Sequence, residues 1–349
     1  MRYVFFNTGS WQGNASMMRF RELGREFVAR GIEVFYAVDD LPYNREKLDV
    51  DPKATVVYTS IRGKISQHWK RRKTIANLKP DFVHVLNPAA KSCMALWGSK
   101  WRVVGDWDEW PVTRPYGFPR RTMEKFLDHW LRHRATVISV CSRYLHEQFR
   151  TRFGLSPHYI PYAAYLPEQP PTTSPYAQRT AVYMGNLYPA YDQDIVFEAA
   201  ALLKARGQEP HITFVGKGPE LEKWSDFVKE RSLSNVNVVG FVSDGVQFWR
   251  YLRHAHVMLF PIRVTPINLA RCPAKTFAYA QACRPIIANK VGEVAEVLGD
   301  KATYIEPTPE AFADAIQNAM ERDLPDVDYG IEAHNWSVRA DALLAALPK

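Results

Sequence analysis

The sequence predicts an α/β protein made of two doubly wound, Rossmann-like domains in tandem, with a cleft between the domains. Short runs of β-branched and aromatic residues alternate with longer amphipathic stretches from end to end, which is typical of βαβ units. The alternation starts afresh after residues 166–178, which are rich in Pro, Thr and Ser and lack periodicity. We therefore expect domains over residues 1–166 and 167–330, and a last helix, 331–349, that packs on the first domain.

In the first half, each expected strand is a short apolar run and each expected helix has apolar residues at helical spacing. Met17, Phe20, Leu23 and Phe27 give the first helix its apolar face. The strands are expected at 3–6, 34–38, 55–58, 82–85, 102–104 and 136–140, and the helices at 15–30, 64–79, 119–134 and 142–152.

The second half repeats the order, and its strands are again rich in Val, Ile and Phe. Strands are expected at 181–184, 212–215, 236–239, 257–260, 286–288 and 303–305, and helices at 192–206, 219–231, 244–254, 271–282 and 309–322. Ligands of such sheets bind beyond the carboxyl ends of the strands.

Charge divides the chain unequally. Residues 1–166 hold 27 basic and 15 acidic residues, a net charge of +12, whereas residues 167–349 hold 18 and 22, a net charge of −4. An anionic partner should therefore meet the first half. The chain has no apolar run long enough to span a membrane, no signal-peptide pattern at its start and no C-x-x-C pair, which together favour a reduced, cytoplasmic setting.

Three segments have the residue types of anion-binding loops. Asn7–Asn14 and Phe214–Glu220 are glycine-containing links between a strand and a helix, where free N–H groups can face an anion. In Pro266–Lys275, Pro273 can open a helix with Lys275 in its first turn. A cation there is unfavourable to the helix dipole unless an anion lies between them, which favours a phosphate. Ordinary βα turns and a solvated lysine remain the alternatives.

Short motifs follow one another in order along nearly the whole chain. They are Glu26–Val34 (EFVARGIEV), Lys79–His84 (KPDFVH), Thr136–Ser142 (TVISVCS), Val182–Leu187 (VYMGNL), Phe214–Pro219 (FVGKGP), Asn235–Gly240 (NVNVVG) and Pro273–Ala288 (PAKTFAYAQACRPIIA). In order and spacing they resemble the GT-B glycosyltransferases of family 4 (glycosyl transferases group 1). The resemblance implies a UDP- or GDP-linked sugar donor held mainly by the second domain. It also implies an acceptor held by the first domain, retention at the anomeric carbon, and no metal ion or other cofactor.

Two of the motifs depart from the family pattern. Where GRLxxxKG supplies an Arg and a Lys for the donor diphosphate, this chain has Asn186 and Tyr191. Where the E-x7-E pair is usual, it has Ala270 and Ala278. We expect Lys275, with Arg271 close by, to neutralise the diphosphate instead. The expected donor-binding residues are Gly13, Asn14, Gly185, Asn186, Gly216, Lys217, Gly218, Phe241, Asn268, Arg271 and Lys275.

Three acids and two tryptophans follow the strand at 102–104. Asp106, Asp108 and Glu109 are the expected catalytic residues, since relatives often carry a His-Asp there that acts on the acceptor. The neighbouring indoles of Trp107 and Trp110 could stack on a sugar. The alternative is an acidic loop packed by its tryptophans, and a strand position for His84 that serves the core.

A basic segment suggests a surface for an anionic partner. Residues 52–80 contain eight Lys and Arg and no acid, with Trp69 and Ile75 on an apolar stripe, and helix 119–134 adds more arginines. Such a face suits an anionic membrane or a nucleic acid, or is simply solvated. The residues expected on it are Arg62, Lys64, Lys70, Arg71, Arg72 and Lys73.

Together these features predict a hexosyltransferase that moves a sugar from a nucleotide-sugar donor to a glycan or lipid-linked acceptor in surface-glycan assembly, peripheral on the inner face of the membrane. Two alternatives stay open. One is a phage-type transferase acting on DNA bases, with a nucleic-acid acceptor. The other is a catalytically impaired pseudo-transferase or partner subunit, which the alanines at 270 and 278 favour.

Overall fold

A computed structural model describes residues 1–11, 15–46, 48–63, 66–164 and 173–348. It contains two compact units. Unit 1 comprises Met1–Ala163, Leu269–Cys272 and Asn335–Lys349, and unit 2 comprises Ala164–Asn268 and Pro273–His334. Residues 166–172 of the expected linker lie outside the described residues.

Unit 1 is built on a parallel sheet with the strand order β3-β2-β1-β4-β5-β6-β7. Its strands are β1 (Arg2–Asn7), β2 (Glu33–Asp39), β3 (Thr55–Thr59), β4 (Phe82–Leu86), β5 (Arg102–Trp107), β6 (Val137–Val140) and β7 (His158–Tyr159). Its helices are α1 (Ala15–Ala29), α2 (Pro42–Glu46), α3 (Ser66–Asn77), α4 (Ala90–Leu96), α5 (Phe118–Arg134), α6 (Arg143–Phe153) and α14 (Trp336–Ala346), with a 3-10 turn at Pro111–Thr113.

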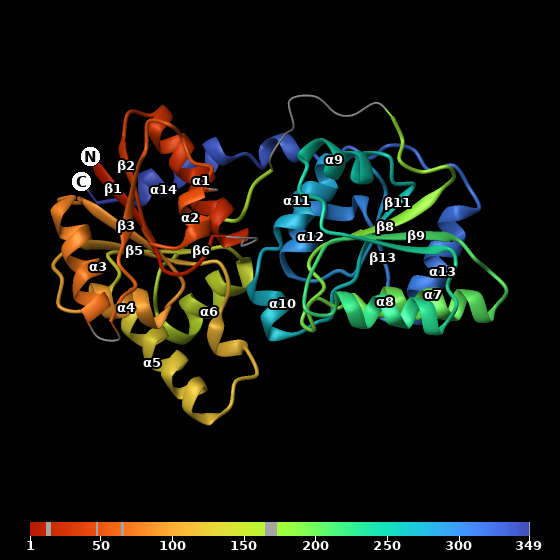
Figure 1. Cartoon of the computed structure of the whole chain (residues 1–349), viewed down its shortest axis with the longest axis horizontal. Coiled ribbons are helices and arrows are strands. Elements are labelled where there is room, and N and C mark those ends of the chain that lie inside the picture. The colour runs from red at the N-terminus through yellow and green to blue at the C-terminus, as the bar shows by residue number, and fades with distance from the viewer. Residues whose placement is uncertain (12–14, 47, 64–65, 165–172, 349) are drawn as a thin grey trace. The chain divides into compact units, whose positions relative to one another are not determined.

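The core of unit 1 is the pair of neighbouring strands β1 and β4 and the helices that cover them. Phe5 of β1 stacks on Tyr36 of β2 with ring centroids 5.4 Å apart. Phe20 and Phe27 of α1 pack on the ring of Phe5. The last helix of the chain, α14, lies beside α1 (Figure 1), where Arg30 pairs with Asp341 at 2.7 Å. The sheet order reverses direction at β1 and β4, which is where doubly wound sheets bind ligands.

Unit 2 repeats the topology with the parallel order β10-β9-β8-β11-β12-β13. Its strands are β8 (Thr180–Met184), β9 (His211–Val215), β10 (Val236–Gly240), β11 (Val257–Phe260), β12 (Ile286–Ala288) and β13 (Thr303–Tyr304). Its helices are α7 (Asp194–Ala205), α8 (Leu221–Glu230), α9 (Gly245–Arg253), α10 (Pro266–Ala270), α11 (Ala274–Gln281), α12 (Gly292–Leu298) and α13 (Pro309–Met320), with 3-10 turns at Gly299–Lys301 and Ile331–Ala333.

Aromatic stacking holds the helices of unit 2 to its sheet. Phe197 of α7 lies between Phe214 of β9 and Trp224 of α8, with ring centroids 3.7 and 4.6 Å away and almost parallel planes. Helix α13 packs beside α7 (Figure 1). The α/β class predicted from the sequence is confirmed. The main differences are short helices, α2, α4, α10 and α12, which are at most two turns long and leave no clear periodicity.

Candidate functional site

Polar side chains hold the loop that follows β1. Asp39, at the end of β2, accepts a hydrogen bond from the Gly9 N–H at 2.9 Å, and Asn44 of α2 accepts one from the Trp11 N–H at 3.0 Å. Asn44 also donates to the Gly9 carbonyl at 3.1 Å. Two expected donor-binding residues of this loop, Gly13 and Asn14, lie outside the described residues.

Arg71 belongs to this internal network and not to the surface. Its guanidinium contacts both carboxylate oxygens of Asp39 at 2.9 Å, and the whole residue is buried. The expectation that Arg71 faces an anionic partner is therefore wrong, because an unpaired carboxylate at Asp39 would otherwise be left inside unit 1. Of the other expected surface residues, Arg62, Lys70 and Lys73 are exposed, Arg72 binds the Trp97 and Gly98 carbonyls, and Lys64 lies outside the described residues.

Asp106 is the centre of a buried polar network at the end of β5. Arg19 of α1 donates to both of its carboxylate oxygens, at 2.6 and 3.0 Å, and Ser139 of β6 donates to it at 2.7 Å. Burial by itself would raise the pKa of Asp106, but Arg19 and His84 outweigh burial and hold that pKa well below its usual range. The side chain is completely buried, so Asp106 cannot meet an acceptor, and its expected catalytic role is replaced by a structural one.

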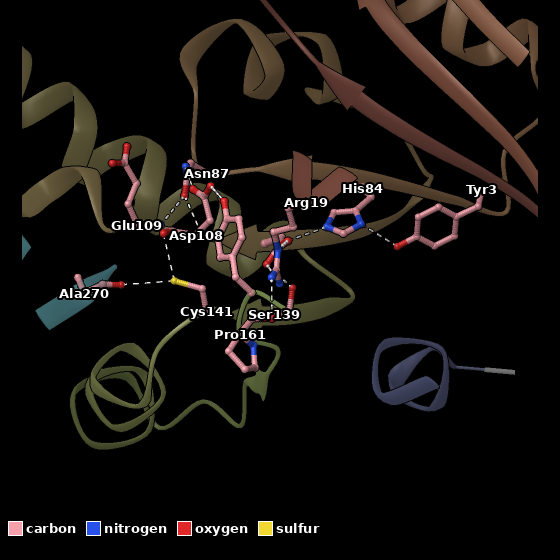
Figure 2. A network of polar contacts seen from close by, with 12 residues as sticks. Tyr3, Arg19, His84, Asn87, Asp108, Glu109, Ser139, Cys141, Pro161 and Ala270 are labelled. Atoms are coloured by element: carbon pink, nitrogen blue, oxygen red, sulfur yellow. Dashed lines mark hydrogen bonds and ion pairs between the residues drawn. The ribbon is translucent and has the colours of Figure 1, made fainter. Parts of the chain in front are cut away.

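His84 extends the network across the sheet (Figure 2). Its Nε2 lies 3.2 Å from Asp106 and its Nδ1 lies 2.9 Å from the hydroxyl of Tyr3. Burial lowers the pKa of His84, so the neutral ring with a proton on Nε2 fits both contacts, the Tyr3 hydroxyl donating to Nδ1. His84 is a core residue that links β1, β4 and β5.

Asp108 is held by residues that the sequence analysis did not single out. Asn87 donates its side-chain amide to Asp108, and the Tyr162 hydroxyl donates to it at 2.9 Å. The Asn87 side-chain oxygen accepts from the backbone N–H groups of Asp108 and Glu109, at 3.2 and 3.4 Å. Asn87 has a positive φ of 54° directly after β4, a conformation that asparagine tolerates better than most residues. An Asn-Pro at a strand end was the available signal for it.

Glu109 is the acid of the three that stays partly accessible. It pairs with Arg114, and 27% of its side chain is exposed. Burial and the neighbouring charge of Asp108 raise the pKa of Glu109, against the opposing charges of Arg114 and Arg271. In Figure 2 its side chain lies at the edge of the network, away from Arg19 and His84. Glu109 can therefore accept a hydrogen bond or a proton from a bound hydroxyl.

The tryptophans around these acids are packing residues. Trp107 and Trp110 are buried against Phe149, and both indole N–H groups donate to Asp128 of α5, at 2.9 and 3.2 Å. They are therefore not available to stack on a sugar, and the alternative of a loop packed by its tryptophans describes this segment better.

In unit 2, two loops at neighbouring strand ends touch through their backbones. The Gly185 N–H donates to the Val215 carbonyl at 3.0 Å, and the Leu187 N–H donates to the Lys217 carbonyl at 2.9 Å. A Cβ at Gly216 would lie 1.8 Å from the Gly185 carbonyl oxygen, and one at Gly218 would lie 2.2 Å from that of Leu187. Glycine is therefore required at both positions, and the loops after β8 and β9 form one surface.

Lys275 lies in the first turn of α11, close to the strand ends of β8 and β11. Its Nζ is 4.6 Å from the ring centre of Tyr183 and 4.2 Å from that of Phe260, and both rings are buried. The order of the sheet reverses between β8 and β11. A fixed ammonium beside a helix N-terminus at that point makes an anion-binding arrangement.

The remaining expected donor-binding residues include Asn186, Lys217, Phe241 and Arg271. Asn186 is exposed in the loop after β8, and Lys217 lies 4.0 Å from the ring centre of the exposed Phe241. Arg271 belongs to unit 1 and Lys275 to unit 2.

Asn268 is buried, and its side-chain amide donates to Asp192 and to the Arg263 carbonyl, both at 2.8 Å. Both side-chain N–H groups of Asn268 are used inside the protein, which leaves its side-chain oxygen as the group that could contact a donor. Asp192 occupies the position of the last glycine in the GRLxxxKG pattern. Its φ of +57° lies in the left-handed region that glycine adopts most easily.

The alanines at the E-x7-E positions offer backbone and methyl groups only. Ala270 is buried, and its carbonyl accepts a hydrogen bond from the Ser142 hydroxyl at 2.9 Å. Ala278 is a partly buried residue of α11. In the part of the chain that the structure describes, no three His, Cys, Asp or Glu side chains gather as a metal site would need. Among the same residues, no helix is both long and apolar enough to cross a bilayer.

Solved structures with the same fold cover nearly all of the chain. HepE from Anabaena in complex with UDP is 13% identical with a TM-score of 0.75, and 99% of this chain and 100% of that chain are covered. TarM from S. aureus, a mutant in complex with fondaparinux, α-GlcNAc-glycerol and UDP, is 8% identical with a TM-score of 0.77, covering 99% of both chains. WaaG, a glycosyltransferase involved in lipopolysaccharide biosynthesis, is 15% identical with a TM-score of 0.67, covering 99% and 95%.

Family models match both units. The family described as Glycosyltransferase Family 4 matches residues 18–163, and the family described as Glycosyl transferases group 1 matches residues 178–322. Among curated proteins, no sequence matches the chain. The two family models follow one another along the chain, and each unit has the doubly wound topology that the fold requires. The chain belongs to the group 1, family 4 glycosyltransferases, and it is a glycosyltransferase of the GT-B fold.

Proposed function

We propose that this glycosyltransferase moves a sugar from a UDP- or GDP-linked donor, bound by unit 2, to a hydroxyl of a glycan or lipid-linked acceptor, with retention and without a metal ion. The observation that carries the donor assignment is Lys275, whose ammonium lies against two buried rings at the N-terminus of α11. UDP is bound in the solved structures of HepE and TarM, which supports UDP as the first nucleotide to test.

The donor diphosphate would be neutralised by Lys275 in place of the Arg and Lys of GRLxxxKG. The joined loops at Gly185–Leu187 and Gly216–Gly218 approach one another so closely that backbone, not side chains, would face the nucleotide. Lys217 and the exposed ring of Phe241 are next to these loops and suit a sugar or base face. As the bond to the sugar breaks, negative charge develops on the phosphate, and a nearby fixed cation stabilises that charge.

On the acceptor side, Glu109 is the carboxylate that would contact the attacking hydroxyl. Asp106 is neutralised by Arg19, and Asp108 already accepts from Asn87 and Tyr162. The raised pKa of Glu109 gives it a proton affinity closer to the working range of an acid–base group than an exposed carboxylate has.

An acceptor from lipid-linked or surface-glycan assembly is supported by WaaG, which is involved in lipopolysaccharide biosynthesis. The exposed Arg62, Lys70 and Lys73 would face anionic groups near such an acceptor. We place the enzyme at the inner face of the cytoplasmic membrane, where the anionic leaflet attracts basic surfaces.

The donor assignment is tested by Lys275→Met, with Lys290→Met as the matched control. Lys290 is an exposed lysine of the same unit that lies near Asp300 and Tyr304. With UDP- and GDP-sugars as substrates, K275M should lower kcat/KM by about 100-fold, the effect of removing one transition-state charge partner. The kcat/KM of K290M should stay within about twofold of the wild-type value.

A folded K275M that turns over donor as the wild type does would overturn the donor assignment. The acceptor assignment has its own readout. Glu109→Gln should abolish transfer to the acceptor and leave UDP binding unchanged, because Glu109 belongs to unit 1. Transfer at the wild-type rate by E109Q would remove Glu109 from the mechanism.

A further inference from the structure

Helices α4 and α5 expose a row of large apolar side chains that neither the fold nor the transfer reaction uses. Trp97, just after α4, stacks on Trp130 of α5 with ring centroids 5.4 Å apart and planes 6° apart, and on Phe126 at 6.4 Å. Met123 precedes Phe126 by three residues and Trp130 follows it by four, so the three lie on one face of α5. We call Trp97, Met123, Phe126 and Trp130 the aromatic ladder.

The ladder is a second apolar face of α5, not the one that docks the helix. Leu127 and Leu131 are buried and attach α5 to unit 1, while Phe126 and Trp97 are each more than half exposed. At the start of the helix, Phe118 is 84% exposed. Contiguous exposed apolar side chains of this size mark an interaction surface in a soluble protein.

The ladder is held in place by arginines from both sides. Arg72 of α3 donates to the carbonyls of Trp97 and Gly98, at 2.7 and 2.9 Å. Arg134 of α5 donates to the carbonyls of Ser99 and Trp101, at 2.9 and 2.7 Å. The segment that carries Trp97 is therefore fixed between α3 and α5 before any partner binds, which reduces the entropy cost of binding.

The charge around the ladder is strongly positive. Helices α3, α4 and α5 contain ten Lys and Arg, of which Arg71 is buried against Asp39, and two acids, Glu124 and Asp128. Both acids lie next to an arginine of their own helix: Asp128 is 2.9 Å from Arg132, and Glu124 is 3.6 Å from Arg120. The helices that carry the ladder also carry exposed cations, among them Lys91, Arg121 and Lys125.

We propose that the aromatic ladder inserts into the headgroup region of an anionic membrane, with the exposed cations of these helices on lipid phosphates. Apolar rings flanked by cations fit an interfacial membrane element, since the rings enter the acyl boundary while the charges stay among the headgroups. A nucleic acid would place its phosphates on cations and leave Met123 and Phe126 without an apolar partner. This surface differs from Arg62, Lys70 and Lys73, and the proposal rests on the membrane location proposed above and not on the transfer reaction.

The test uses the full chain with vesicles of phosphatidylcholine and phosphatidylglycerol, and with vesicles of phosphatidylcholine alone. Co-sedimentation should need the anionic lipid and should weaken as salt is raised. Met123→Ser with Phe126→Ser should lower the partition coefficient by about tenfold or more, since two large apolar groups no longer leave water. The control is Val264→Ser, which removes a 69% exposed apolar side chain from unit 2 and should leave partitioning unchanged.

Brominated lipids locate the surface directly. Quenching of tryptophan fluorescence on vesicle binding should fall in Trp97→Phe and should persist in Trp69→Phe, which changes a 66% exposed tryptophan of α3. If quenching instead fell in Trp69→Phe and persisted in Trp97→Phe, α3 and not the aromatic ladder would contact the membrane, and the proposal would be overturned. The proposal would also be overturned if the ladder variants bound vesicles as strongly as the wild type, or if the wild type did not bind vesicles.

Two further outcomes would assign another occupant and overturn the proposal. One is a ladder-dependent dimer in solution that does not bind vesicles, and the other is ladder-dependent binding to duplex DNA in place of vesicles. Turnover of donor in solution is measured in parallel. Ladder variants should keep it, so failure of membrane binding and failure of the transfer reaction are distinguished.

Discussion

Three residues apart in the sequence, Asp106 and Glu109 have pKa values shifted in opposite directions. Asp106 is surrounded by Arg19, His84 and Ser139, which favour its charged form. Glu109 is only partly exposed and lies beside Asp108, which disfavours its charged form despite Arg114. The two side chains meet different neighbours because Asp106 lies within β5, whereas Glu109 follows the end of that strand at Trp107 and pairs with Arg114. The environment separates the structural acid, Asp106, from Glu109, the acid proposed to contact the acceptor.

Replacing Asp106 should destabilise the protein strongly. In Asp106→Asn the Arg19 guanidinium stays completely buried without its carboxylate, which should cost about 3–5 kcal/mol in the free energy of unfolding. Urea unfolding followed by circular dichroism measures this cost. Asp40→Asn, which removes an exposed partner of Arg45, is the control and should leave the midpoint nearly unchanged.

The pH dependence gives this prediction a sign. The pKa of Asp106 is lower in the folded chain than the value of about 3.9 for an unfolded aspartate. Its contribution to stability is therefore complete above that unfolded value and is lost as the pH falls below it. The difference in the free energy of unfolding between wild type and D106N should shrink as the pH falls from 7 to 3. A difference that grows over this range would contradict the ion pair between Asp106 and Arg19.

At the scale of elements, the sequence indicated the long strands and helices because their periodicity is strong, and it missed what depends on contacts across the sheet. Asn87 follows the end of β4, and Tyr162 follows the end of β7. No local sequence pattern therefore links either residue to Asp108. Arg71 has the sequence context of a basic surface, yet it pairs with Asp39, 32 residues earlier. A charge run does not say which of its members turns inward.

The paired loops of unit 2 provide an element-scale prediction. Gly218→Ala would place a Cβ 2.2 Å from the Leu187 carbonyl oxygen, so the loops after β8 and β9 must separate. We expect a loss of about 1–3 kcal/mol in stability and weaker donor binding, as for other overpacked sites. Calorimetric titration with UDP and thermal unfolding measure both effects.

Gly245→Ala is the matched control for this loop. A Cβ at Gly245 meets nothing within 4 Å, and the residue opens α9, where alanine is a good helix former. G245A should therefore be neutral or slightly stabilising. If G218A were as stable as G245A and bound UDP equally well, the close approach of the two loops would not be needed for the donor site.

At the scale of the whole molecule, sequence order and structural unit do not coincide. Leu269–Cys272 and Asn335–Lys349 belong to unit 1, although they follow the strands of unit 2 in the sequence. We expected the last helix to pack on the first domain, and α14 belongs to unit 1, although hydrophobic periodicity alone identifies a helix and not the sheet that it joins. The excess of basic residues still follows the units, since the basic helices α3, α4 and α5 all lie in unit 1.

The last prediction uses this division. A ligand that binds only the folded state adds stability by mass action, about 2.7 kcal/mol at a concentration of 100 times its Kd. If unit 2 binds the donor nucleotide, UDP should slow hydrogen exchange mainly in the loops at Gly185–Leu187 and Gly216–Gly218 and at the start of α11. The amides of β1, β4 and β5 in unit 1 should change little. Hydrogen exchange read by mass spectrometry resolves these peptides.

K275M serves as the control in the same measurement, because it keeps both glycine loops and removes the cation proposed to bind the diphosphate. Protection by UDP should be lost in K275M and kept in K290M. UMP, which has the same base as UDP but a single phosphate, should protect less than UDP if the charge of the diphosphate accounts for most of the binding. Protection confined to unit 1, or equal protection by UMP and UDP, would contradict a donor site built around Lys275.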